Sequence, residues 1–158
     1  MDNSSALTVA ELRFLAELNA GGVSYLVVGL SAALLQGANT ATQDVDLWFE
    51  STADSRIGAA ARAAGGIWVP GGWAGRGPQL GGDLGDRFDV VVMMSGLDAF
   101  AIEYARSRTV AIDGVSVRVL PLDRILASKR AANRLKDQAV IPALEEALAA
   151  SEDQEPTP

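Results

Sequence analysis

Two aspartates, Asp44 and Asp46, stand in an otherwise apolar run, residues 42–49, that is typical of a β-strand. Strands are depleted in aspartate, because a short charged side chain packs poorly on a half-buried sheet. Side chains alternate along a strand, so both carboxylates are expected on one face, roughly 7 Å apart. Like charges held there repel unless a cation lies between them. The pair predicts a site for a hard divalent ion, Mg²⁺ or Mn²⁺, and chemistry on phosphate groups.

A third aspartate, Asp89, stands in a second apolar run, residues 87–94. If this strand lies beside the first, about 4.8 Å away, three carboxylates converge. Three carboxylates can hold two divalent ions, or one ion together with a carboxylate that acts as general base. The alternative for Asp89 is an ion pair with Arg87. The alternative for the first two aspartates is a strand end that exposes both to solvent.

The apolar run before these aspartates ends at Gly29 and continues directly into a short helix of small residues, 31–36. A strand that turns into a helix in this way directs free backbone N–H groups at one spot, where a triphosphate is expected to bind. Glycine at such a turn also occurs for tight packing alone.

The composition excludes several kinds of chemistry. The chain has no cysteine and no histidine, which rules out disulfides, thiolate zinc sites, Ser-His-Asp triads and imidazole metal ligands. Acid–base catalysis would depend on carboxylates, lysine, tyrosine or water. The net charge of -7 argues against broad nonspecific binding of nucleic acid. The length of 158 residues predicts one domain over residues 1–150 and a flexible acidic tail over 151–158.

No apolar stretch has the roughly 18 to 20 residues that a membrane span requires. The longest, residues 23–35, is interrupted by Gly29 and Ser31, and residues 1–5 contain no basic residue. We therefore expect no secretory signal, no membrane association and a cytoplasmic location.

The elements that must position these residues form a mixed α/β pattern, of the α+β kind. We expect a short mixed sheet flanked by helices, followed by a helical C-terminal segment. A capping box at Thr8 and Glu11 predicts a helix that ends at Gly21-Gly22. Further strands are expected at 23–29, 109–112 and 115–120, with a tight hairpin turn at Asp113-Gly114. Further helices are expected at 57–64, 97–106 and 121–150, the last with a break near Asn133, and residues 65–85 are expected to form a loop or an irregular hairpin.

A local basic cluster stands in this acidic chain, formed by Lys129, Arg130, Arg134 and Lys136. One interpretation is a contact surface for a triphosphate or an RNA acceptor. The alternative is a solvated helix face on which Arg134 pairs with Asp137 one turn later.

The order of these motifs resembles the signature of the nucleotidyltransferase superfamily, in which a Gly-Gly or Gly-Ser turn precedes an Asp-x-Asp strand. The matching residues are Leu26-Val27-Val28-Gly29-Leu30-Ser31, Gly37, Thr42 and Asp44-Val45-Asp46-Leu47. The C-terminal part is similar to small AbiEii-toxin-like and minimal nucleotidyltransferases, through Leu122-Asp123-Arg124-Ile125 and through Lys129, Arg134, Lys136 and Asp137. The resemblance covers roughly residues 23–147.

This resemblance implies transfer of a nucleoside monophosphate from an NTP to an acceptor hydroxyl, with Mg²⁺ or Mn²⁺ as cofactor. Asp44 and Asp46 would bind the metal, and Asp89 would ligate a second ion or accept the hydroxyl proton. The implied contacts with nucleotide phosphates come from Gly29, Ser31, Lys129 and Arg134. The acceptor would be a tRNA, a protein or a small molecule, and a toxin-like role would add an antitoxin-type protein partner.

The chain departs from the family pattern at three positions. Leu30 replaces the second small residue of the turn and is expected where a phosphate would lie. Thr40 stands where relatives often carry arginine, and Val140 replaces an acidic residue. These departures favour a second hypothesis, a non-catalytic binding module of the same fold that acts through a protein partner. A third, a metal-dependent nuclease, would use the same carboxylates without the Gly29 turn.

Overall fold

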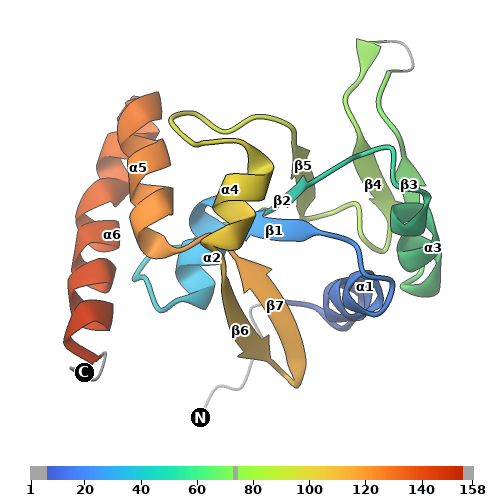
Figure 1. The fold of residues 1–158 in the computed structure, drawn as a ribbon, viewed down its shortest axis with the longest axis horizontal. Coiled ribbons are helices and arrows are strands. Elements are labelled where there is room, and N and C mark those ends of the chain that lie inside the picture. Colours follow the sequence, from blue (N-terminus) through green and yellow to red (C-terminus); the bar gives the residue numbers. More distant parts are fainter. Residues whose placement is uncertain (1–6, 73–74, 155–158) are drawn as a thin grey trace.

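A mixed five-stranded sheet forms the centre of the protein, and helices pack around it (Figure 1). The computed structural model describes residues 7–72 and 75–154, so residues 1–5 and the last four residues of the expected tail lie outside the described part. The strand order is β5-β2-β1-β7-β6, and the strands are β1 (Tyr25–Val28), β2 (Val45–Phe49), β5 (Phe88–Val91), β6 (Arg108–Ile112) and β7 (Val115–Val119). This architecture confirms the predicted fold class.

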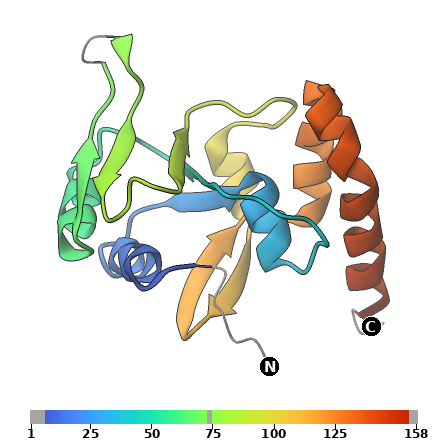
Figure 2. The same ribbon diagram turned by 180° about the vertical axis from the view of Figure 1, so that it is seen from behind.

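The helices lie on both sides of this sheet. They are α1 (Val9–Ala20), α2 (Gly29–Leu35), α3 (Ser55–Ala63), α4 (Phe100–Ala105), α5 (Leu122–Ala132) and α6 (Leu135–Gln154). Helices α5 and α6 pack together at one end of the molecule, and α1 and α3 pack together at the other. Seen from behind, α2 lies across the middle, and the chain that follows it crosses to the start of β2 (Figure 2). None of the helices in the described ranges combines the length and apolar character needed to cross a membrane.

Local sequence rules account for several of these elements. Thr8 and Glu11 form the predicted capping box, in which each side chain accepts a hydrogen bond from the other residue's backbone N–H. Asp113 and Gly114 both adopt positive φ, at 47° and 83°, and form the turn between β6 and β7. The glycine-rich segment forms the hairpin alternative, with β3 (Gly66–Val69) antiparallel to β4 (Gln79–Gly82). This hairpin projects away from the main sheet (Figure 1).

The pairing of β2 determines where the candidate residues lie. β2 runs antiparallel to β1, with Asp46 opposite Val28, and parallel to β5, with Asp46 opposite Asp89. Because β1 ends at Val28, the turn at Gly29 lies beside Asp46. The sheet therefore places the glycine turn and two carboxylates in one row.

The two faces of β2 differ in character. On one face, Val45 lies opposite Phe88, which makes an edge-to-face contact with Phe14 of α1 at a centroid distance of 5.6 Å. These side chains belong to the buried core. By the alternation of a strand, Asp46 and Trp48 point to the other face. The hydrophobic effect thus fixes the register that turns Asp46 away from the core.

The structure corrects several of the predicted boundaries. β2 begins at Val45, so Asp44 precedes the strand rather than lying within it. β5 ends at Val91, opposite Trp48, so residues 92–94 leave the sheet. The predicted helix break is confirmed at Asn133, which adopts a left-handed conformation with φ 50°. Helix α6 then continues to Gln154, four residues beyond the predicted end.

Candidate active site

Gly29 and Asp46 are in direct contact. A Cβ atom at position 29 would lie 2.5 Å from Oδ2 of Asp46, and Gly29 has a φ of +66°. Any other residue would meet the carboxylate and would also adopt a backbone conformation that L-residues rarely take. The turn from β1 into α2 therefore requires glycine, for reasons of both space and backbone geometry.

Ser31 connects the same two elements. Its hydroxyl donates to the backbone carbonyl of Val28 at 2.9 Å and accepts from the backbone N–H of Asp46 at 3.3 Å. The side chain is buried. In this structure the hydroxyl holds the first turn of α2 against β2, and the phosphate contact expected for Ser31 stays a prediction.

Asp46 is influenced by both negatively and positively charged side chains. Burial raises the pKa of its carboxyl, and the negative charges of Asp89 and Asp44 raise it further. Lys129 and Lys136 act in the opposite direction and lower this pKa. This juxtaposition of acidic and basic groups was expected from the family resemblance, which placed the three aspartates and Lys129 in one site. The net result is a half-buried carboxylate whose negative charge is only partly compensated.

The acidic residues fit one divalent ion better than a cage of protein ligands. Within residues 7–72 and 75–154, no three acidic side chains are arranged to hold a metal. Asp44 and Asp89 are exposed, and Asp46 is half-buried. Mg²⁺ is commonly bound by one or two carboxylates, with water and substrate phosphates completing its shell. Asp46, with either Asp44 or Asp89 near it, can supply these carboxylates.

A cavity of about 420 Å³ opens beside Asp46. Its lining comes from the glycine turn, β2, the segment after β5 and helix α5, and it consists of Gly29, Asp46, Val91, Met93, Met94, Ser95, Ile125, Ser128, Lys129, Ala132 and Arg134. We call this cavity the catalytic cleft. Four residues that the sequence assigned to the site therefore meet at its wall, from segments a hundred residues apart in the chain.

Other predicted residues lie outside this lining. Asp44 and Asp89 are not among the described residues that line the cleft, although both act electrostatically on Asp46. Leu30 and Thr40, the two departures near the glycine turn, are not among them either. The Leu30 side chain therefore does not form part of the cleft wall.

The basic wall of the cleft is organised by Asp137. Its carboxylate is fully buried and accepts from Nε of Arg134 at 2.7 Å, with Nζ of Lys129 at 3.4 Å. These cations, the Arg134 hydrogen bond first among them, lower the pKa of Asp137 to about 2. The ion pair between Arg134 and Asp137 that the sequence offered as an alternative is thus confirmed. The same carboxylate also fixes Lys129, because the break at Asn133 turns α6 back toward α5.

The segment between β5 and α4 was not predicted to be part of the site. Met93 and Met94 line the cleft, and Met93 is 84% exposed. Gly96 has a φ of +69° and packs directly against Ala131 of α5. The available signal was Ser95-Gly96, a turn dipeptide that ends the apolar run.

A buried ion pair anchors the same segment at its other end. Glu103 of α4 is fully buried and accepts from Nη2 of Arg124 at 2.7 Å and from the backbone N–H of Asp98 at 2.9 Å. Hydrogen bonds to an ionised carboxylate are stronger than those between neutral groups. The segment over the cleft is therefore fixed to α4 and α5 rather than loosely attached.

Neither a protein-family model nor a curated protein matches this sequence. Three solved structures are similar in fold. The crystal structure of ANT(2'')-Ia in complex with adenylyl-2''-tobramycin has a TM-score of 0.54 and 16% identity, over 89% of this chain and 88% of that chain. The solution structure of antibiotic-resistance factor ANT(2'')-Ia has a TM-score of 0.56 and 16% identity, over 90% and 83%. An antigenic nucleotidyltransferase-like protein from Paracoccidioides brasiliensis has a TM-score of 0.50 and 17% identity, over 91% and 78%. The protein therefore has a nucleotidyltransferase-like fold.

Proposed function

We propose that this protein is a metal-dependent nucleotidyltransferase that moves a nucleoside monophosphate from an NTP to an acceptor hydroxyl. The observation that carries the proposal is the row formed by Gly29, Asp46 and Asp89, of which Gly29 and Asp46 line the catalytic cleft together with Lys129. The fold similarity supports it, since the ANT(2'')-Ia structure holds adenylyl-2''-tobramycin, a nucleotidylated small molecule.

Each element of the site has a role in this reaction. Asp46 and Asp44 would hold the divalent metal, Mg²⁺ or Mn²⁺, which leaves the carboxylate of Asp89 available as the base. A metal held there would neutralise charge on the phosphates and orient them. Lys129 and Arg134 face the triphosphate from α5 and the start of α6, where Asp137 fixes both cations. Gly29 permits the phosphates to approach the backbone closely.

The chemical step is an in-line displacement at the α-phosphorus. The acceptor oxygen forms a bond to the α-phosphorus, and the bond from that phosphorus to the oxygen bridging toward the β-phosphate breaks. Pyrophosphate leaves with the electron pair of the broken bond. Asp89 takes the hydroxyl proton, because its exposed carboxylate lies beside Asp46 on β5, an edge strand of the sheet. Positioning and electrostatic stabilisation supply the catalysis.

The finer identity is also a proposal. The segment with Lys129, Arg134 and Asp137 supports a small AbiEii-toxin-like or minimal nucleotidyltransferase, with an antitoxin-type partner and a cytoplasmic location. For such an enzyme the acceptor would be a tRNA or a protein, whereas nucleotidyl transfer in general also allows a small-molecule acceptor, as in the ANT(2'')-Ia complex. A non-catalytic module was the main alternative, on account of Leu30 and Thr40. Because neither residue lines the cleft in the described structure, we favour catalysis.

Titration calorimetry of each NTP, with and without Mg²⁺, tests the proposal. We expect saturable binding of at least one NTP that requires Mg²⁺ and is abolished in the double variant Asp44→Asn with Asp46→Asn. The matched control is Asp113→Asn, which removes one carboxylate in a surface turn that asparagine also tolerates. Unchanged binding in the double variant would refute the site assignment, and failure of every NTP to bind would refute the function.

A further inference from the structure

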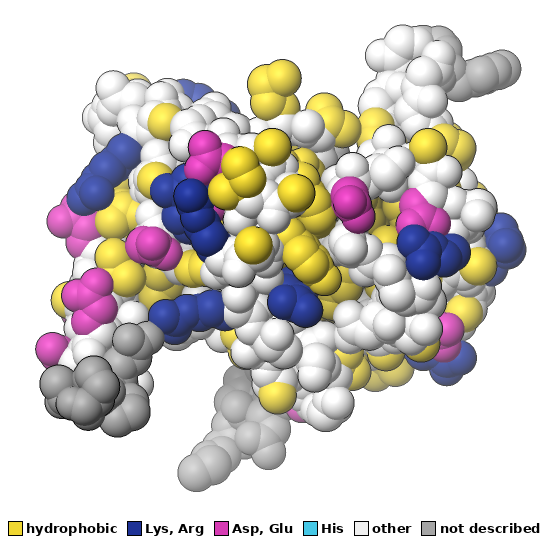
Figure 3. All heavy atoms as spheres, viewed as in Figure 1, with side chains coloured by type: hydrophobic (Ala, Val, Ile, Leu, Met, Phe, Trp, Pro, Cys, Tyr) yellow, Lys and Arg dark blue, Asp and Glu magenta, His cyan; other side chains and the backbone are white. Residues whose placement is uncertain are grey.

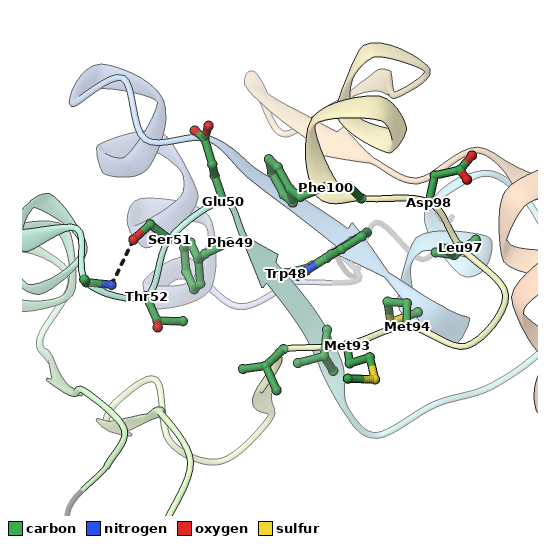
Figure 4. Close-up of a pocket in the computed structure, with 14 residues that line it drawn as sticks. Trp48, Phe49, Glu50, Ser51, Thr52, Met93, Met94, Leu97, Asp98 and Phe100 are labelled. Atoms are coloured by element: carbon green, nitrogen blue, oxygen red, sulfur yellow. Dashed lines mark hydrogen bonds between the residues drawn. The ribbon is translucent and has the colours of Figure 1, made fainter.

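A second cavity of about 580 Å³ adjoins the catalytic cleft on the same face of the sheet. The two cavities share Val91, Met93 and Met94 in their linings. Trp48 of β2 and Phe100 of α4 form a wall of the second cavity, with an edge-to-face contact at 5.2 Å and 86°. In Figure 4, Trp48 points from β2 toward Leu97 and Phe100, and Met93 and Met94 lie along the segment after β5. We call this space the β5-side cavity.

The position of this cavity relative to the cleft indicates which reactant it would hold. In the proposed reaction, the triphosphate lies against the Gly29 turn and α5, so pyrophosphate departs on that side of Asp46. An in-line displacement requires the acceptor hydroxyl to approach from the opposite side. In the strand order β5-β2-β1, that side is β5, which carries Asp89, the proposed base. The β5-side cavity begins where β5 ends, at Val91.

The lining of the β5-side cavity defines the chemistry of its occupant. None of its lining residues is basic, and two are acidic, Glu50 and Asp98. Asp98 is already paired with Arg106 at 2.9 Å, whereas Glu50 forms no salt bridge within the described residues and acts on Arg56 only through its charge. Ser51 and Thr52 add hydroxyl groups, and the remaining surface is mainly aromatic and aliphatic. A phosphate-rich molecule would meet no basic side chain in this cavity. An apolar ring with an ammonium substituent would contact both an apolar wall and a carboxylate.

The exposed apolar residues at the rim point to the same kind of ligand. Val92 is 68% exposed and Met93 is 84% exposed, although both are large and apolar. Hydrophobic side chains gather across the middle of this face, over α4 and the segment before it (Figure 3). Exposed apolar groups beside a cavity are typical of a binding surface, and methionine adapts its shape to a ligand. A bound ring would cover these side chains.

We propose that the β5-side cavity is the acceptor subsite, and that it takes a small alcohol with an apolar ring and a protonated amine. This assignment rests on the proposed nucleotidyl transfer and deepens it. The ring packs against the wall of Trp48 and Phe100, and the ammonium faces Glu50. The hydroxyl points toward Asp89, and Glu50 lies roughly 13 Å farther along β2 than Asp46 by strand rise. The volume lies in the range of small-molecule sites.

A series of three phenols tests the subsite without requiring turnover. Tyramine carries a hydroxyl, a ring and an ammonium; 4-ethylphenol lacks the ammonium; and 4-hydroxyphenylacetate carries a negative charge instead. Each is titrated into the nucleotide-free protein, and the indole N–H signal of Trp48 is followed by NMR.

We expect tyramine to bind about tenfold more tightly than 4-hydroxyphenylacetate, because unlike charges attract and like charges repel across a binding surface. Glu50→Gln should weaken tyramine binding about threefold to fivefold and leave 4-ethylphenol unchanged. Glu152→Gln, which alters an exposed glutamate at the end of α6, is the matched control.

The outcomes separate this inference from the proposed function. Mg²⁺-dependent NTP binding without any tyramine effect on Trp48 overturns the subsite alone. Tyramine binding without binding of any NTP refutes nucleotidyl transfer, and with it the acceptor role of the cavity. Equal affinities for the cationic and anionic phenols, or no effect of Glu50→Gln, overturn the assigned chemistry. So does a 12-nucleotide RNA or a tyrosine-containing peptide that shifts the Trp48 signal at lower concentration than tyramine.

Discussion

The carboxylate of Asp46 occupies the space in which a side chain at position 29 would stand, with only 2.5 Å between Oδ2 and the position of a Cβ atom. The residue type at position 29 and the placement of Asp46 are therefore coupled. A substitution in the turn displaces the carboxylate, even though Gly29 itself has no side chain to contribute.

Gly29→Ala should reduce both stability and metal-dependent nucleotide binding. The left-handed conformation of Gly29 costs about 1–2 kcal/mol for an alanine, and the clash with Asp46 adds about 1–3 kcal/mol, as overpacking generally does. Gly37→Ala is the matched control, because Gly37 has a φ of +93° and a Cβ atom added there would have no neighbour within 4 Å. Urea unfolding and NTP titration of both variants separate the two costs. Equal losses of stability and of NTP affinity in the two variants would show that the contact with Asp46 contributes to neither.

Asp46→Asn should abolish Mg²⁺-dependent NTP binding and make the ligand-free protein more stable at pH 7. Burial and Asp89 raise the pKa of Asp46, so the ionised form destabilises the fold. Removal of that charge should stabilise the protein by about 0.5–1 kcal/mol. The advantage over the wild type should shrink as the pH falls, since protonation of Asp46 relieves the same repulsion. Urea midpoints at pH 7 and pH 4 measure this, and a less stable variant at pH 7 contradicts it.

Lys129→Gln should weaken NTP binding about tenfold or more and raise the pKa of Asp46 further, because Lys129 lowers that pKa in the wild type. A buried or half-buried charge pair in a binding site commonly has an effect of this size on affinity. Carboxyl ¹³C NMR follows the titration of Asp46, and calorimetry follows the nucleotide. Arg130→Gln is the control, since Arg130 lies next in the same helix but pairs with Glu145 at 3.6 Å.

Asp137→Asn should destabilise the protein by about 2–3 kcal/mol, the usual loss for charge-assisted hydrogen bonds. The pKa of Asp137 is lowered to about 2 from 3.8, so its contribution is present above about pH 4 and is lost as the pH falls toward 2. The stability difference between wild type and variant should therefore close over that interval, as urea unfolding at a series of pH values would show. A difference that is independent of pH would mean that the carboxylate acts through packing rather than charge.

The same variant separates a positioning role from a purely structural one. If Asp137 fixes Lys129 and Arg134 for phosphate binding, NTP affinity should fall at pH 7 under conditions in which the variant is fully folded. Asp137→Glu, which keeps the charge, should recover part of that affinity. Loss of stability with unchanged NTP affinity would restrict Asp137 to a structural role.

Features governed by local rules could be predicted from the sequence. The hairpin at Asp113-Gly114 and the helix break near Asn133 follow from residues that adopt positive φ. The closeness of Gly29 and Asp46 was expected from their chemistry, because a triphosphate at the glycine turn would be bridged by a metal ion to the aspartates, and the pairing of β1 with β2 brings the two residues together. The assignment of Lys129 to the same site depended on the family resemblance, because no local rule connects α5 with β2.

Features set by distant partners could not be predicted. The end of β5 depends on where β2 ceases to pair with it, at Trp48 opposite Val91. An apolar sequence such as residues 87–94 contains no sign of that limit, so Met93 and Met94 were assigned to a strand instead of a cavity. The ion pairs of Asp137 with Lys129 and Arg134 likewise depend on the tertiary packing of α6 against α5.

The parallel pairing of β5 at the edge of the sheet has a consequence for folding. The chain between β2 and β5 contains α3 and the β3–β4 hairpin, whereas β1 and β2 meet across a much shorter connection. Pairing between distant segments is slower, because more chain entropy is lost before any contact forms. We therefore expect the Asp46–Asp89 pair to be completed late in folding. The backbone amides of β5 should exchange with solvent before those of β1. Local opening at β5 would then separate Asp89 from Asp46 and abolish activity while most of the core remains folded.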